Sequence, residues 1–173
     1  MTTRVDEASA SRVIERLHAA VNAHDAAAVA AVCAEQVVWS DPAAPEPLRG
    51  RDAVFRFHRD VMFRAIPDVQ IEVIEGPYRS TDGTRVAVRL RIRGTMTGPL
   101  TPPGFGPTGG PIAFETAEFS HIEAGLIARQ TVVLDMLDLA RQISAVPKAD
   151  SLAGRIGVWL QRVASRRLRR RRR

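Results

Sequence analysis

Cysteine is nearly absent from this chain of 173 residues, which contains only Cys33. A single cysteine can form neither an internal disulfide nor a cysteine-based metal cluster, so neither is expected to hold the fold together. Aromatic residues make up only 5 % of the sequence, but apolar residues make up 45 %, which is enough for one hydrophobic core. We therefore expect one domain with a short extension, in a reducing compartment such as the cytoplasm.

Long hydrophobic runs are also missing from the sequence. No segment approaches the roughly eighteen consecutive apolar residues that a membrane-spanning helix needs. The N-terminal segment MTTRVDEASASRVIERL is charged and lacks the apolar stretch of a signal peptide. These absences favour a cytoplasmic protein, and attachment to the surface of a membrane remains open.

Acidic residues are scarce at the C-terminal end. From Lys148 onward the chain has ten basic residues and one acidic residue, Asp150, a net charge of +9. Because the whole chain carries +6, the preceding 147 residues carry a net −3. We therefore divide the chain into a mildly acidic body, residues 1–146, and a basic extension, residues 147–173.

The basic extension has the pattern of an amphipathic helix. Asp150 is placed to cap a helix that runs from Ser151 to about Leu168. Its apolar face is formed by Leu152, Ile156, Trp159, Leu160 and Val163, and its arginine cluster includes Arg166, Arg167, Arg169 and Arg170. Three interpretations remain open: contact with an anionic membrane surface, sequence-independent contact with nucleic acid, and packing on the body or on a second subunit.

Three helices are expected in the first part of the body. Apolar spacing predicts a first helix over residues 8–24, and Asp25 is placed to cap a shorter helix that continues through Cys33. A short strand over residues 37–39 follows. A third helix is expected over about residues 52–65, where the sequence Ile-Pro-Asp ends it.

Strands dominate the second part of the body. Residues 85–93 alternate strictly, with apolar side chains on one face and arginines on the other: Arg85, Arg89, Arg91 and Arg93. Residues 99–111 hold five prolines and four glycines and are expected to form an irregular loop. Two long strands joined at Glu123-Ala124-Gly125 and a short helix follow. Three helices, four antiparallel strands and a short helix predict an α+β fold, a curled sheet folded over helices.

The last predicted strand ends on an acidic residue, Asp135, directly after the β-branched and apolar residues 131–134. A carboxylate in such a place is costly to bury unless it is paired, hydrogen-bonded or protonated. Desolvation raises the pKa of a carboxyl group toward the range in which it can both accept and return a proton. Asp135 is therefore a candidate general acid/base. It is equally a candidate N-cap of the helix over residues 136–143, and one residue can do both.

Other candidates come from histidines and large apolar side chains. Candidate walls of a substrate pocket are Trp39, His58, Met62, Met96 and Phe114, and each has an alternative role as an ordinary core residue. His18 resembles His58, since both lie on the apolar face of a predicted helix. No spacing of histidines and acidic residues suggests a metal site. No glycine-rich phosphate-binding loop follows a strand.

Six short segments occur along the body in an order that resembles a known family. They are Val21–Asp25, Val37–Pro42, Pro67-Asp68, Gly94–Pro99, Ile122–Ile127 and Asp135–Gln142. Together they resemble the SnoaL-like polyketide cyclases, within the superfamily named after nuclear transport factor two. The resemblance implies a cone-shaped α+β barrel, in which three N-terminal helices pack in a strongly curved antiparallel sheet.

The resemblance also implies an activity. Cyclases of this family close a ring by intramolecular aldol condensation without metal or cofactor, and a carboxylate removes a proton from a carbon beside a carbonyl group. The resemblance assigns the role of this carboxylate to Asp135 and a second catalytic role to His121. In the predicted hairpin His121 lies opposite residue 127 or 128, about 25 Å from Asp135 along the sheet. Met96 stands where the family motif usually has histidine, which removes one polar group.

The same fold hosts enzymes and non-enzymes, so a second hypothesis stays open. In the first, the chain is a cofactor-independent cyclase, or an isomerase, dehydratase or epoxide hydrolase, that acts on a hydrophobic carbonyl compound. In the second, it is a binding or assembly module that holds a small ligand without catalysis. The expected partners are a hydrophobic small molecule and a second copy of the chain in a homodimer. An anionic membrane or nucleic acid is the expected partner of the basic extension.

Overall fold

The structure is a computed structural model that describes residues 7–101, 104–147 and 151–171. The chain forms two compact units, Met1–Met136 and Leu137–Arg173. The first holds the three N-terminal helices and the strands expected for the body. The second holds most of helix α5 (Met136–Gln142) and the whole of helix α6 (Leu152–Arg171). The division falls after Met136, earlier than the boundary after residue 146 that charge alone suggested. Asp150, the expected cap of α6, lies outside the described residues.

The first two helices are α1 (Glu7–Asn22) and α2 (Ala26–Ala31). Asp25 caps α2 as predicted, because its carboxylate accepts a hydrogen bond from the backbone N–H of Ala28 at 2.9 Å. The prediction that this helix continues through Cys33 is wrong. Cys33 begins strand β1 (Cys33–Ser40), because residues that could extend a short helix instead pair with a distant strand.

The third predicted helix is a continuous helical segment with a widened middle. It consists of α3 (Arg51–Phe57), the π-helical turn η1 (His58–Met62) and α4 (Phe63–Ala65). A π-helical turn adds one residue to the helical repeat, and such turns are frequent at functional sites. Here the widened turn begins at His58, which is buried.

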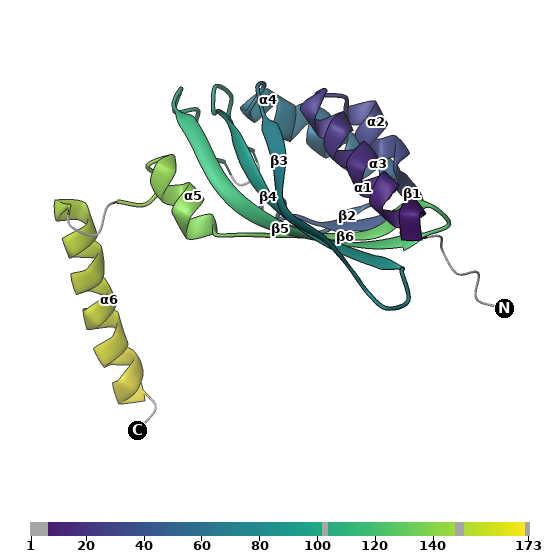
Figure 1. Ribbon diagram of the computed structural model, residues 1–173. Coiled ribbons are helices and arrows are strands. Elements are labelled where there is room, and N and C mark those ends of the chain that lie inside the picture. Colours follow the sequence, from purple (N-terminus) through teal and green to yellow (C-terminus); the bar gives the residue numbers. More distant parts are fainter. Residues whose placement is uncertain (1–6, 102–103, 148–150, 172–173) are drawn as a thin grey trace. The chain divides into compact units, whose positions relative to one another are not determined.

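Six strands form one sheet in the order β2-β1-β6-β5-β4-β3. Besides β1, they are β2 (Leu48–Arg49), β3 (Gln70–Arg79), β4 (Arg85–Thr95), β5 (Pro111–Glu123) and β6 (Leu126–Leu134). The four predicted antiparallel strands are β3 to β6. The sheet also contains a parallel pair, β1 with β6, which the sequence did not indicate. The predicted α+β fold with a curved sheet and helices is confirmed, and Figure 1 shows α1, α2 and α3 across one face of the sheet.

The two faces of the sheet differ as the alternation in β4 predicted. Val86, Val88, Leu90 and Ile92 are buried on the inner face, toward the helices. On the outer face Arg89 forms ion pairs with Glu75 and Glu115, and Arg91 forms ion pairs with Glu72 and Glu115. Because these pairs are exposed, each contributes little to stability. The inner face, in contrast, is buried, so a site that lies there is shielded from water.

Two of the segments that carry the family resemblance contact each other. Asp68 accepts hydrogen bonds from the backbone N–H and the hydroxyl group of Thr95, at 2.6 and 2.7 Å. The backbone N–H of Gly98 donates to the carbonyl oxygen of Ala65 at 3.1 Å. The Pro67-Asp68 and Gly94–Pro99 segments therefore fasten the end of the third helix to the end of β4.

Candidate active site

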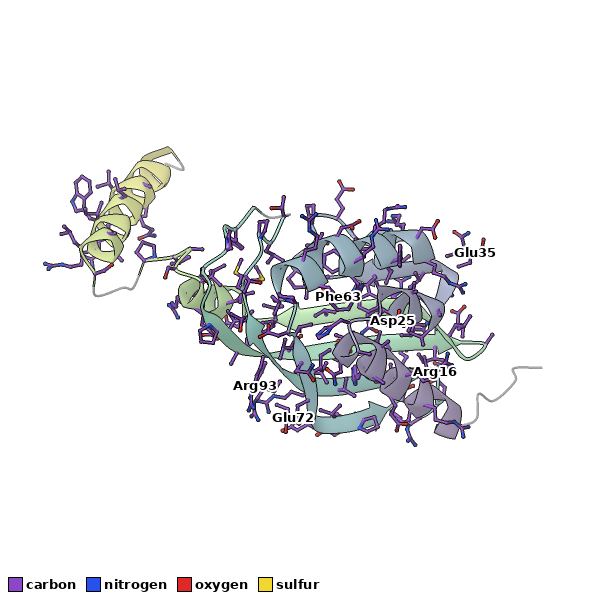
Figure 2. The ribbon with its side chains drawn as sticks, turned by 90° about the horizontal axis from the view of Figure 1, so that it is seen from above. Arg16, Asp25, Glu35, Phe63, Glu72 and Arg93 are labelled. Atoms are coloured by element: carbon purple, nitrogen blue, oxygen red, sulfur yellow. The ribbon has the colours of Figure 1, made fainter. Side chains whose placement is uncertain are left out.

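Strand β5 places polar side chains on the inner face of the sheet. Its buried residues alternate along the strand and are Ile112, Phe114, Thr116, Glu118, Ser120 and Ile122. The middle three are polar, and they lie between apolar residues at either end. A glutamate in this position must find partners, since an unpaired buried charge is costly. Figure 2 views this region from above, with Phe63 marking the third helical segment and Glu72 and Arg93 marking the β3–β4 edge.

The partner of Glu118 is His18 on helix α1. The Nε2 atom of His18 lies 3.0 Å from Oε2 of Glu118, and the two side chains are only 9 % and 8 % exposed. Either group can hold the proton of this hydrogen bond, because imidazole and carboxyl groups are both acids and bases. The pair therefore joins an acid and a base in a place with little access to water.

Asp41 adds a second carboxyl group to the same region. Burial raises the pKa of this carboxyl group above its ordinary value of 3.8, the backbone N–H of Ala43 partly opposes this shift, and the charge of Glu118 adds to it. Asp41 as a residue is half-buried, but its carboxyl group is the more deeply buried part. The protonated form of Asp41, which is a hydrogen-bond donor, is therefore favoured more than in water.

His58 is held in one orientation by its neighbours. Its Nδ1–H donates to the carbonyl oxygen of Val54 at 2.9 Å, since a carbonyl group can only accept. Its ring packs edge-on against Trp39 and Phe57, with centroids 5.2 and 5.5 Å apart. Burial lowers the pKa of His58, so the neutral ring is favoured and its Nε2 is left as an acceptor.

Two buried N–H donors in the described part of the chain have no hydrogen-bond partner. They are Nε1 of Trp39 and Nε2 of Gln130. The indole N–H lies close enough to Asp41 to lower the pKa of its carboxyl group, but the contact falls short of hydrogen-bond geometry. The other amide atom of Gln130 accepts from the hydroxyl group of Ser120. An unpaired buried donor costs about 1–3 kcal/mol, which a bound acceptor would recover.

The sheet register brings these groups into one row. Trp39 on β1 pairs with Gln130 on β6, and Gln130 pairs with Ser120 on β5. Glu118 precedes Ser120 by two residues on the same face of β5, and Asp41 follows Trp39 by two residues. Adjacent strands lie about 4.8 Å apart, so the two unpaired donors are neighbours. We call the set of His18, Trp39, Asp41, His58, Glu118 and Gln130 the inner polar cluster.

The structure does not place Asp135 in the inner polar cluster. Asp135 follows β6 and is exposed, so the predicted desolvation by its apolar neighbours is wrong. The reason is the alternation of the strand: Asp135 shares the parity of the exposed Val133 and not that of the half-buried Val132 and Leu134. A run of apolar residues does not by itself show which face an adjoining carboxylate takes.

His121 and Asp135 are not brought together either. The register pairs His121 with Arg129, six residues before Asp135, or about 20 Å along the strand. His121 lies outside the inner face, in a surface groove of 360 Å³ lined also by Tyr78, Arg85 and Phe119. Its Nδ1 lies 3.4 Å from a carboxylate oxygen of Glu123. Both residues remain hypotheses for catalysis, without a shared site.

Two of the five predicted pocket residues belong to the inner polar cluster, and three do not. Trp39 and His58 are buried in the inner polar cluster. Met96 and Phe114 are buried too, but Phe114 lies four residues along β5 from Glu118, about 13 Å away. Met62 is half-buried in η1.

Sequence reasoning missed Glu118, Asp41 and Gln130. A signal for Glu118 was present, because the alternation of Ile112, Phe114 and Ile122 gives it the parity of a core residue. No comparable signal marks Gln130, which is completely buried. Its position depends on the register of β6.

No group of three histidine, cysteine or acidic side chains in the described ranges is arranged to hold a metal ion. Cys33 is buried, its thiol donates to the carbonyl oxygen of Val29 at 3.5 Å, and burial raises the pKa of this thiol to about 12. A thiol with such a pKa is almost never a thiolate at neutral pH, so Cys33 is unsuited to nucleophilic catalysis.

The raised pKa of Asp41 predicts a dependence of stability on pH. A carboxyl group whose folded-state pKa lies above its unfolded value stabilises the fold fully below the unfolded pKa, near 3.8. This contribution is lost as the pH rises through the folded-state pKa. Asp41→Asn should therefore lose less unfolding free energy than the parent chain between pH 4 and pH 7, as measured by urea denaturation. An equal or larger loss in Asp41→Asn would contradict the raised pKa.

The body combines a curved sheet, helices across its inner face and buried acid, base and donor groups between them, which places it in the α+β class. The match to the SnoaL-like domain covers residues 14–130. The chain belongs to this family, which confirms the resemblance found in the sequence. Among curated proteins, none matches the chain.

Solved structures share the fold at low sequence identity. A putative SnoaL-like polyketide cyclase from Jannaschia sp. CCS1 matches with a TM-score of 0.70 and 18 % identity, over 81 % of this chain and 94 % of that one. AclR, a putative hydroxylase from Streptomyces galilaeus, matches with a TM-score of 0.68 and 21 % identity, over 82 % and 100 %. SalBIII, an epoxide hydrolase/cyclase-like enzyme in pyran ring formation in salinomycin, matches with a TM-score of 0.64 and 22 % identity, over 77 % and 95 %.

Proposed function

We propose that the body is a cofactor-independent enzyme that moves a proton at a carbon beside a carbonyl group in a hydrophobic compound. The observation that carries the proposal is the buried contact between His18 and Glu118. In this proposal Glu118 takes the proton, and His18 orients the carboxylate and exchanges the proton with it. General acid–base catalysis by such a pair contributes about 10²–10⁴ to the rate.

Removal of this proton leaves negative charge on the carbonyl oxygen, which the site must stabilise. The unpaired N–H groups of Trp39 and Gln130 are suited to this role, since they are buried, lie on paired residues of adjacent strands and form no hydrogen bond within the described part of the chain. Donors held in place before the reaction stabilise a developing oxyanion more than water does. Asp41, whose carboxyl pKa is raised by burial, is a third donor when it is protonated.

The same steps serve more than one reaction. An enolate that attacks a second carbonyl group of the same molecule closes a ring, which is the aldol chemistry of a polyketide cyclase. An enolate that takes its proton back at another carbon gives an isomerase. The cyclase and cyclase-like enzymes among the structures of similar fold favour ring closure. The substrate would be apolar, because Leu17, Val54 and Val88 are buried on the surrounding elements.

The proposal is tested by α-proton exchange in a simple ketone. β-Tetralone is apolar and has acidic C–H bonds beside its carbonyl group, and β-naphthol resembles its enol. We expect the full-length chain in D₂O to accelerate deuterium incorporation into β-tetralone, followed by NMR, and β-naphthol to inhibit it, because enzymes bind analogues of the activated state tightly. If the chain neither accelerated exchange of β-tetralone nor bound β-naphthol, the proposal would be contradicted.

The alternative function, a binding module without catalysis, rests on the same unpaired donors. They would bind the acceptor groups of a ligand whether or not a proton moves. Binding of β-naphthol without any exchange of β-tetralone is the result that favours this alternative.

We further propose that two copies of the chain pair through the outer face of the sheet. Exposed apolar side chains lie there beside the ion pairs of Arg89 and Arg91, namely Tyr78, Phe119 and Val133. A contiguous patch of this kind is typical of a protein–protein interface.

A further inference from the structure

Helix α6 exposes a row of large apolar side chains. Leu152 is 76 % exposed and Trp159 is 62 % exposed, and Ile156, Val158 and Leu160 are exposed as well. At 100° per residue, Leu152, Ile156, Trp159, Leu160 and Val163 fall within an arc of about 100°. A helix with such an arc needs an apolar surface to cover it.

Arginines lie along one edge of this apolar arc. Arg155 and Arg162 fall within about 60° of its margin, and neither forms an ion pair with a described residue. Arg166, Arg167, Arg169 and Arg170 belong to the last turns of α6, and their side chains lie outside the described part. Residues 151–173 contain nine arginines and no acidic residue. The helix therefore carries a strong positive charge that nothing within it neutralises.

We propose that α6 binds the surface of an anionic lipid membrane, with its apolar arc among the lipid chains near the headgroups and its arginines on the lipid phosphates. Each arginine near such a surface contributes about 1 kcal/mol, and the apolar arc adds affinity that charge alone does not supply. No helix in the described ranges is long and apolar enough to cross a membrane, so α6 lies along the surface. This inference does not depend on the catalytic proposal.

Charge and pattern disfavour two other partners. A second copy of α6 would bring two strongly positive helices together without an acidic residue to pair with them, and the apolar spacing stops where Arg166 and Arg170 begin. A nucleic acid would neutralise the arginines but would leave the apolar arc, including Trp159, in water. An anionic membrane is the surface that satisfies both parts of the helix.

The test uses the full-length chain and two variants of equal charge. Leu160→Glu places a carboxylate in the apolar arc, whereas Gln161→Glu places it on the opposite side of α6. We expect the parent chain to float with vesicles of phosphatidylglycerol and phosphatidylcholine but not with phosphatidylcholine alone. The apparent partition coefficient should fall about fivefold for Gln161→Glu and about 50-fold or more for Leu160→Glu.

Fluorescence of Trp159 provides a second measurement. The chain has two tryptophans, so a Trp39→Phe variant leaves Trp159 as the sole reporter. Its emission should be that of an exposed indole in buffer and should shift to the blue when anionic vesicles are added. Equal losses for both glutamate variants, or binding to duplex DNA in place of vesicles, would overturn the proposal. So would a Trp159 emission that is already blue-shifted in buffer and unchanged by vesicles.

Discussion

Replacing Glu118 by glutamine is expected to lower kcat/KM for α-proton exchange of β-tetralone by about 10²–10⁴-fold. The amide of glutamine has nearly the shape of the carboxyl group and can still bond to His18, but it cannot accept a proton from carbon. The fold should therefore persist while the proton transfer is lost. Binding of β-naphthol should change less than the rate, because the N–H groups of Trp39 and Gln130 remain in place.

A matched control lies three residues away on the same strand. Glu115→Gln makes the same chemical change on the outer face of β5, where Glu115 pairs with Arg89 and Arg91. Because exposed ion pairs contribute little, this variant should keep its activity and nearly all of its stability. Equal activity in the two variants, with β-naphthol still bound, would contradict the role of Glu118.

Replacing Gly98 by alanine is expected to lower the free energy of unfolding by about 3 kcal/mol. A Cβ atom at this position would overlap the carbonyl oxygen of Arg64 and crowd the backbone of Ala65. Relief would require the segment to move away from the third helical segment, which would break the hydrogen bond from Gly98 N–H to Ala65. Urea denaturation monitored by circular dichroism measures the loss.

Gly106→Ala is the control for this substitution. Gly106 lies eight residues after Gly98, within the proline- and glycine-rich residues 99–111, and an added Cβ atom there would meet no atom within 4 Å. Its effect on the free energy of unfolding should stay within about 0.5 kcal/mol. If Gly98→Ala were as stable as Gly106→Ala, the close contact of Gly98 with Arg64 and Ala65 would be absent in solution.

Local patterns predicted most of the individual elements. The alternation in residues 85–93 identified β4 and its buried face, because one side of a strand was apolar and the other charged. Asp25 predicted the start of α2, because an N-cap satisfies a backbone N–H within three residues. Such features depend on neighbours in sequence. Their order, three helices followed by four antiparallel strands and a short helix, came from the same patterns, and the family resemblance added the cone-shaped barrel.

The inner polar cluster depends on contacts that local patterns do not contain. His18 and Glu118 are 100 residues apart in sequence. The neighbouring positions of Trp39 and Gln130 follow from the parallel pairing of β1 with β6, which the sequence did not indicate. For Asp135, in contrast, local sequence predicted a burial that the structure does not have. Its apolar neighbours are adjacent in sequence, but strand alternation sends its side chain to the exposed side.

The most direct test of the account compares Glu118→Gln with Asp135→Asn in the same exchange assay. Both substitutions turn a carboxylate into an amide, one in the inner polar cluster and one at the exposed end of β6. We expect a loss of at least about a hundredfold for Glu118→Gln and a change of less than about threefold for Asp135→Asn. The reverse order, with activity lost in Asp135→Asn and retained in Glu118→Gln, would contradict the central claim that proton transfer occurs at the buried pair of His18 and Glu118.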